Sequence, residues 1–141
     1  MSKTSVWAVV PAAGRGSRMG TEVPKQYLHL SGKPVVQYTL EAFTGHARIA
    51  GVVIVISAED QLWSNLSNSI DGDLRVAIGG AERCHSVLAG LNELAEVADE
   101  NDWVMVHDAA RPCLRSSDID KMISDLSISQ WGGILAVTHF E

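Results

Sequence analysis

The run from Val52 to Ile56 consists only of β-branched residues, with no polar residue among them. Such a run is typical of a central parallel strand covered on both faces, because a strand with one solvated face would alternate polar and apolar residues. Other apolar runs predict buried strands at Val6–Val10 and Trp103–Val106, a short strand at Leu74–Ile78 and a final strand at Ile134–Val137.

Segments with the apolar spacing of helices lie between these strands. Val36, Leu40 and Phe43 predict a helix that follows a turn at Ser31–Pro34 and ends near Gly45. The alternation predicts an α/β domain with a mostly parallel sheet and right-handed crossovers, in which ligands bind beyond the carboxyl ends of the strands. The other helices are predicted from a capping box of Ser57 and Asp60 before Ala58–Leu66, from Val87, Leu91, Leu94 and Ala98, and from Ser117 and Asp120 with Ile119, Met122, Ile123 and Leu126.

The loop after the first predicted strand combines glycines with cations. We expect the strand to break at Pro11, and Gly14 and Gly16 then follow two residues apart. Glycine lets backbone N–H groups approach an anion closely, because no Cβ blocks the approach. The cations of this segment are Arg15, Arg18 and Lys25. Because a polyphosphate requires full positive charges, the segment predicts a triphosphate-binding loop.

Two common phosphate-binding motifs do not fit this loop. A P-loop needs a glycine-lysine pair followed by Ser or Thr, whereas Gly32-Lys33 is followed by Pro34. The dinucleotide fingerprint would need glycine where Met19 stands. Gly14-x-Gly16 alone is equally compatible with a tight turn, so only the longer string P-A-A-G-x-G-x-R-M followed by P-K-Q is specific.

Another candidate loop runs from His107 to Pro112, after the fourth predicted strand. Asp108 at a strand end beside a phosphate loop suits a magnesium ion or a ribose hydroxyl, since Mg²⁺ favours one or two carboxylates together with phosphate oxygens. In the alternative interpretation, Asp108 caps a turn and pairs with Arg111. We expect His107 to pack or to orient the loop rather than to act as a base.

The composition indicates a folded protein without a nucleic-acid surface. The chain has 141 residues, of which 46% are hydrophobic, and a formal net charge of −6, which argues against a nucleic-acid surface. It has no apolar run of membrane-spanning length and no signal-peptide pattern at its amino terminus, so we expect a cytoplasmic protein that contacts no membrane. Cys84 and Cys113 match no metal spacing and are expected to be reduced thiols.

The three loops together resemble the 2-C-methyl-D-erythritol 4-phosphate cytidylyltransferase family. The resemblance rests on Pro11–Gly14 with Pro24–Leu28, on H-D-A-A-R-P at His107–Pro112, and on G-G-x-x-R-x-x-S-V at Gly79–Val87. It implies a three-layer, Rossmann-like nucleotidyltransferase fold with a mostly parallel twisted sheet. The implied reaction joins CTP to 2-C-methyl-D-erythritol 4-phosphate and releases pyrophosphate.

The resemblance also implies roles for individual residues. Arg18 and Lys25 would be catalytic, Arg111 would bind the acceptor, and Asp108 would bind the metal, expected to be Mg²⁺. Gly80 and Ser86 would lie against the cytosine ring, where Ala12 and Ala13 offer backbone groups. The full set of implied nucleotide-binding residues is Pro11, Ala12, Ala13, Gly14, Arg15, Gly16, Gly80, Ser86, Asp108 and Ala109.

Members of the family continue past the point where this sequence ends. The resemblance therefore implies that residues 1–141 are a single domain, incomplete at its carboxyl end, that stops before the acceptor-binding and dimer-arm segments. The expected partners are CTP and a small polyol phosphate, with a homodimer in the full-length form. Two alternatives stay open: a ribitol 5-phosphate cytidylyltransferase, and a non-catalytic nucleotide-binding or oligomerisation module.

Overall fold

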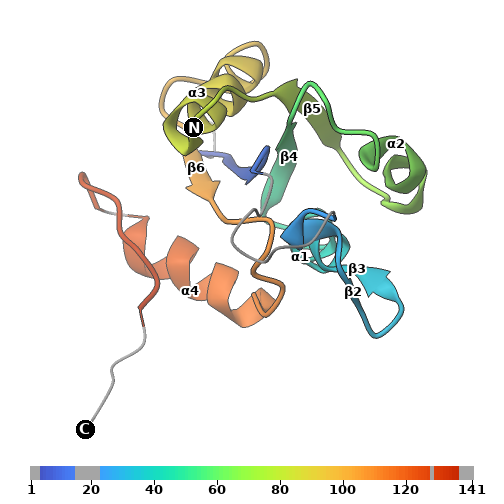
Figure 1. The fold of residues 1–141 in the computed structure, drawn as a ribbon. Coiled ribbons are helices and arrows are strands. Elements are labelled where there is room, and N and C mark those ends of the chain that lie inside the picture. Colours follow the sequence, from blue (N-terminus) through green and yellow to red (C-terminus); the bar gives the residue numbers. More distant parts are fainter. Residues whose placement is uncertain (1–3, 15–22, 128, 137–141) are drawn as a thin grey trace, which may run out of the picture.

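A computed structural model describes residues 4–14, 23–127 and 129–136 of the chain (Figure 1). Its centre is a four-stranded sheet with the order β5-β4-β1-β6 in which every neighbouring pair is parallel. The strands are β1 (Val6–Ala12), β4 (Ile49–Ile56), β5 (Leu74–Ile78) and β6 (Trp103–Val106). The predicted α/β class with a mostly parallel sheet is confirmed.

Helices cover both faces of this sheet, giving three layers (Figure 1). On one face, Leu94 of α3 (Arg83–Leu94) packs against Val9 and Val55. The other face carries α1 (Val35–Thr44), the short α2 (Trp63–Leu66) and α4 (Ser116–Leu126). The side chains of Val53 and Val55 are fully buried, as the unbroken apolar run of β4 predicts, and Val9 of β1 is fully buried as well.

Strand β6 is less buried than its sequence predicts. It pairs with β1 on one side, and among the described residues no strand pairs with its other edge. Trp103, Val104 and Met105 are half-buried, and Val106 is 41% exposed. An apolar run therefore identified the strand but not its place at the edge of the described sheet.

Pro11 does not end β1, contrary to the prediction. It lies within the strand, opposite Val55 of β4, and its carbonyl accepts a hydrogen bond from the amide of Ala109 at 3.4 Å on the β6 side. The N–H that proline lacks would point to the same side as that carbonyl, where β6 has already ended at Val106. The missing N–H therefore faces no strand, and β1 continues to Ala12.

The turn predicted at Ser31–Pro34 closes a small hairpin. Its strands are β2 (His29–Leu30) and β3 (Lys33–Pro34), and the turn residues Ser31 and Gly32 have φ angles of 51° and 88°. Positive φ at both positions matches the twist of a two-residue hairpin. Pro34 directly precedes α1, and Gly45 directly follows its last residue, so both predicted limits are confirmed.

The predicted helix Ala58–Leu66 is much shorter in the structure. Only Trp63–Leu66 is α-helical, followed by the 3₁₀ turn η3 (Ser67–Ser69). The Asp60 carboxylate accepts hydrogen bonds from the amides of Leu62 and Trp63 at 2.8 and 2.9 Å. Asp60 thus binds amides at the start of a helix that begins after it, and it is not the third residue of a helix that begins at Ala58.

The predicted apolar face of helix α3 is confirmed at Leu94, which is buried, but not at Leu91. Ser86, Gly90 and Leu94 are its buried residues, while Leu91 is 38% exposed. A Cβ on Gly90 would lie 2.6 Å from Val9 Cγ1, so the missing side chain allows the helix to approach the sheet. The contact face of α3 thus combines the predicted Leu94 with two small residues, Ser86 and Gly90, that the apolar spacing did not identify.

Two predictions near the carboxyl end are also corrected. Asp118, not Asp120, closes the start of α4 by accepting a 2.9 Å hydrogen bond from the Arg115 amide, and Asp120 pairs with His46. The predicted strand Ile134–Val137 is not formed over residues 134–136, and Val137 lies outside the described residues. The Ile134 side chain is 87% exposed, so it has no packing partner that would hold a strand. In the part of the chain that the structure describes, no helix has the length and apolarity to cross a membrane.

Candidate functional site

Three loops meet where the parallel strands end. The amides of His107 and Ala109, just after β6, donate to the carbonyls of Val9 and Pro11 in β1 at 3.1 and 3.4 Å. The Gly79 amide, just after β5, donates to the carbonyl of Ile56 at 2.8 Å. From β1, the chain adds β4 and β5 on one side of the sheet and β6 on the other. A doubly wound sheet binds its ligands at such a point, beyond the carboxyl ends of the strands.

The first loop is held by a buried amide side chain. Nε2 of Gln26 donates to the carbonyls of Ala12 and Gly14 at 2.8 and 3.0 Å, and Gln26 is only 6% exposed. The bonds fix the start of the loop at Ala12–Gly14, directly after β1. Residues 12–14, which the sequence predicts to bind a nucleotide, are therefore held by Gln26, fourteen positions after Ala12.

Lys25 is exposed directly before two buried residues. It begins the 3₁₀ turn η2 (Lys25–Tyr27), in which Gln26 and Tyr27 are buried. The Tyr27 hydroxyl donates to Asp60 Oδ2 at 2.5 Å, and burial together with this hydrogen bond raises the pKa of Tyr27. The P-K-Q-Y string thus presents one cation at the site with its two following residues fixed in the fold.

The second loop, Gly79–Ser86 after β5, lies against the first, and the third is His107–Pro112 after β6. An added Cβ on Gly79 would lie 2.4 Å from Ser86 Oγ and 2.9 Å from the Ala13 Cβ, so the three residues are close neighbours. Ser86 is 2% exposed and its amide donates to the Glu82 carbonyl at 3.2 Å. Gly80 is exposed, with His85 beside it. The structure therefore brings Ala13 and Ser86 together, as the implied base site requires.

Asp108 in the third loop lies between two arginines. Its Oδ1 accepts hydrogen bonds from Nη2 and Nε of Arg83 at 2.7 and 3.1 Å, and its Oδ2 lies 3.3 Å from Nε of Arg111. Partial burial raises the pKa of the Asp108 carboxyl, but the hydrogen bond and charge of Arg83 and the charge of Arg111 outweigh burial and hold it below its usual value. The pairing with Arg111 is the one foreseen in the alternative interpretation.

Arg83 was not assigned a role from the sequence. It belongs to the G-G-x-x-R-x-x-S-V string and begins α3, yet its guanidinium reaches Asp108, 25 residues further along the chain. The sequence does contain a signal for this role. The string includes an arginine, and the loop expected at the same edge of the sheet carries a carboxylate that an arginine could bind. The ion pair joins the second loop to the third.

The backbone of the third loop is fixed by two side chains. Nε2 of His107 donates to the Arg111 carbonyl at 2.9 Å, and the ring packs edge-on against Phe43. The buried Thr39 donates to the carbonyl of Ala109 at 3.1 Å. His107 is thus held as a loop-orienting residue, as expected, and Ala109 is 3% exposed.

The described residues do not fit a magnesium ion bound directly by Asp108. Each of its oxygens faces a guanidinium, and two neighbouring cations oppose the approach of a third. The group of His, Cys, Asp and Glu side chains that could hold a metal in the described part of the chain is elsewhere, at Glu82, Cys84 and His85. Direct metal binding by Asp108 is therefore incompatible with the ion pairs that this carboxylate makes.

A cavity of about 690 Å³ lies beside the third loop. Its lining includes Arg83, Asp108 and Arg111, but most of it is apolar side chains of β6 and α4 together with residues 132–135. Apolar walls suit an apolar occupant better than a triphosphate. We therefore place the anion site at the loops and not in this cavity. Of the residues assigned from the sequence, Arg15, Gly16 and Arg18 lie outside the described residues.

The carboxyl ends of the parallel strands carry a glycine-containing loop, an exposed lysine and two arginines. This combination defines an α/β domain of the phosphate- or nucleotide-binding class. The family model described as 2-C-methyl-D-erythritol 4-phosphate cytidylyltransferase matches residues 6–139. The chain belongs to this family.

Relatives and solved structures agree with this membership. A 2-C-methyl-D-erythritol 4-phosphate cytidylyltransferase of Pseudomonas putida is 48% identical over 132 residues, which are 93% of this chain and 56% of that protein. A crystal structure of 4-diphosphocytidyl-2C-methyl-D-erythritol synthase has a TM-score of 0.83 and 33% identity, covering 96% of this chain and 60% of that one. The Francisella tularensis enzyme has a TM-score of 0.70 and 32% identity, covering 90% of this chain and 54% of its own. The chain thus spans little more than half the length of these relatives.

Proposed function

We propose that this chain supplies the CTP-binding part of a cytidylyltransferase that acts on 2-C-methyl-D-erythritol 4-phosphate. The products are 4-diphosphocytidyl-2-C-methyl-D-erythritol and pyrophosphate, in the synthesis of isoprenoid precursors. The observation that carries the proposal is that the three motif loops of this family come together at one edge of the sheet, with Ala13 beside Gly79 and Ser86, and with Arg83 on Asp108.

The reaction requires charge neutralisation more than proton transfer. A phosphate oxygen of the acceptor attacks the α-phosphorus of CTP, a new P–O bond forms, and the bond to the β-phosphate breaks to release pyrophosphate. Because the attacking phosphate is already ionised, no general base is needed. Lys25 and Arg18 bind the triphosphate and stabilise the negative charge that grows around the α-phosphorus.

The base would be recognised by backbone groups and one hydroxyl. Ala12, Ala13 and Gly14 offer backbone atoms fixed by Gln26, and the buried Ser86 lies next to them. A site of this kind distinguishes cytosine from uracil and purines by hydrogen bonds that the wrong base leaves unmade. The remaining proposed contacts are Pro11, Arg15 and Gly16 with the triphosphate, Gly80 with the base, Asp108 and Ala109 with the ribose, and Arg111 with the acceptor.

Further parts of the proposal rest on the sequence pattern and on family membership. These are the Mg²⁺ requirement, the homodimer of the full-length form, the cytoplasmic location, and the absence of nucleic-acid and membrane partners. Asp108 would become a metal ligand only after its arginines moved to the substrates. The Mg²⁺ requirement therefore stays a prediction, measured as the loss of turnover on chelation and its return when Mg²⁺ is added.

The proposal is tested with a chimera in which this chain replaces the matching region of the Pseudomonas putida relative. Pyrophosphate release is measured with CTP and either 2-C-methyl-D-erythritol 4-phosphate or ribitol 5-phosphate as acceptor. Turnover with the first acceptor and not the second is the expected result. Preference for ribitol 5-phosphate would support the alternative enzyme. A folded chimera that binds nucleotide without turnover of either acceptor would support a non-catalytic module.

A further inference from the structure

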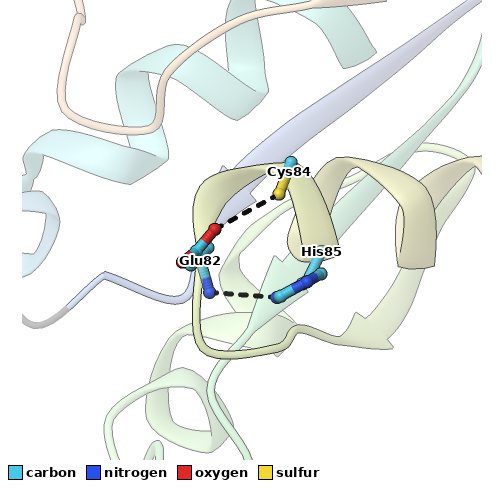
Figure 2. Close-up of side chains that lie close together, drawn as sticks. All are labelled: Glu82, Cys84 and His85. Atoms are coloured by element: carbon cyan, nitrogen blue, oxygen red, sulfur yellow. Dashed lines mark hydrogen bonds between the residues drawn. The ribbon is translucent and has the colours of Figure 1, made fainter.

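Three side chains with metal-binding atoms surround the amino end of α3. They are Glu82, which precedes the helix, and Cys84 and His85 in its first turn (Figure 2). One ligand atom from each lies within 4.8 Å of the others, and all three residues are exposed. None of the steps proposed above uses these side chains.

The spacing of the atoms is close to that of a metal site. In tetrahedral zinc sites the bonds are about 2.0–2.3 Å long, which puts neighbouring ligand atoms about 3.3–3.8 Å apart. Cys84 Sγ already lies 3.7 Å from Glu82 Oε2 (Figure 2). The third atom needs a shift of about 1 Å, which exposed side chains reach by small rotations.

His85 already directs a lone pair toward Glu82. Its Nδ1 accepts a hydrogen bond of 3.4 Å from the Glu82 amide (Figure 2). A bond of this length is weak, so a metal can replace it at small cost. The imidazole thus offers a nitrogen ligand without losing a strong interaction.

The charges of the donors suit a borderline divalent cation. One carboxylate and one thiolate neutralise a dication, and the neutral imidazole adds no charge. The amino end of a helix favours negative charge, and both anionic donors lie there. The neighbouring guanidinium of Arg83 is directed to Asp108, 2.7 Å away, so its charge is already paired. Sulfur and nitrogen donors favour Zn²⁺ over Mg²⁺ or Ca²⁺.

We propose that Glu82, Cys84 and His85 form a binding site for Zn²⁺ or a cation of similar chemistry, with the remaining coordination position open to water. On binding, the Cys84 S–H bond breaks, the sulfur bonds to the metal, and the proton goes to solvent. The site lies on the loop that carries Gly80 and leads to Ser86. It does not depend on the proposed reaction.

The test is a titration of the 141-residue chain with Co²⁺, which reports a thiolate ligand through a sulfur-to-metal absorption band. The band should saturate at one equivalent, vanish when Zn²⁺ is added, and be accompanied by proton release. Cys113→Ser is the matched control, because Cys113 is the other exposed cysteine, and it should keep the band.

Two further variants keep the test decisive. Cys84→Ser should lose the band, and Glu82→Gln should weaken Zn²⁺ binding by about tenfold or more, because losing a charged ligand costs at least as much as losing an outer-shell partner. Circular dichroism checks that each variant is folded. The proposal is overturned if the parent chain shows no band, if Cys113→Ser abolishes it, or if a folded Cys84→Ser retains it. None of these outcomes depends on CTP, so they are separate from failure of the proposed function.

Discussion

Asp108 joins the second and third loops because it accepts from Arg83 and lies beside Arg111. Its pKa is lower in the folded chain than in an unfolded one, despite partial burial that acts in the opposite direction. A lowered folded pKa means that the carboxylate stabilises the fold above its unfolded pKa, near 4, and that this stabilisation is lost as the pH falls through the folded pKa.

Asp108→Asn should therefore cost stability at neutral pH and little at acid pH. The side chain is partly exposed, so solvent screening limits the expected loss to about 1 kcal/mol or less at pH 7. Urea unfolding of the variant and parent chains at pH 7 and near pH 3 measures the difference. An equal difference at both pH values would show that the charge of Asp108 is not what stabilises the loops.

Lys25 is a second residue whose role is separable from the fold, because it is exposed while Gln26 and Tyr27 are buried. Lys25→Ala in the chimera should lower kcat by roughly 10²-fold, the scale of losing one transition-state donor, and change stability by less than about 0.5 kcal/mol. Arg18→Ala should have a similar effect on kcat.

Lys121→Ala is the control for charge alone, since the ammonium of Lys121 pairs with Asp125 on α4 and not with the loops. It should leave kcat unchanged in the pyrophosphate-release assay. Near-normal turnover in both the Lys25 and Arg18 variants would remove these two residues from the mechanism.

At the scale of elements, α3 is positioned by small residues. Gly90→Ala would place a methyl group 2.6 Å from Val9 Cγ1 and 3.1 Å from Val55 Cγ2. The helix must then move away from the sheet, and we expect a loss of about 1–3 kcal/mol by urea unfolding. Leu88→Ala, at a residue 55% exposed on the same helix, is the matched control, expected within about 0.5 kcal/mol of the parent. Equal losses in both variants would contradict close packing at Gly90.

The elements could be predicted where hydrophobic pattern and turn chemistry agree. The hydrophobic pattern identified β4 and α1, and the turn residues Pro34 and Gly45 correctly marked the two limits of α1. The prediction that β1 ends at Pro11 was wrong. The effect of a missing N–H depends on whether a neighbouring strand faces that position, and this is a property of the whole sheet. The sequence pattern also missed Arg83, since local spacing does not show that a helix residue reaches a loop 25 positions away.

At the scale of the molecule, the described sheet is unevenly protected. β4 lies between β5 and β1 and is buried over most of its length, whereas β6 pairs with β1 alone in the described residues and borders the 690 Å³ cavity. Amide hydrogens of Val52–Ile56 should therefore exchange much more slowly than those of Trp103–Val106 in the 141-residue chain. Equal protection of the two strands would mean that the free edge of β6 is covered in solution.

The central claim is that the three loops form a cytidine nucleotide site, and a nucleotide titration tests it most directly. The chain and the chimera are titrated with CTP in the presence of Mg²⁺, with UTP, ATP and GTP as controls. We expect selective, saturable binding of CTP that Ser86→Ala weakens by about tenfold, the scale of one lost hydrogen bond to the base. Equal binding of all four nucleotides by both folded proteins would contradict the account.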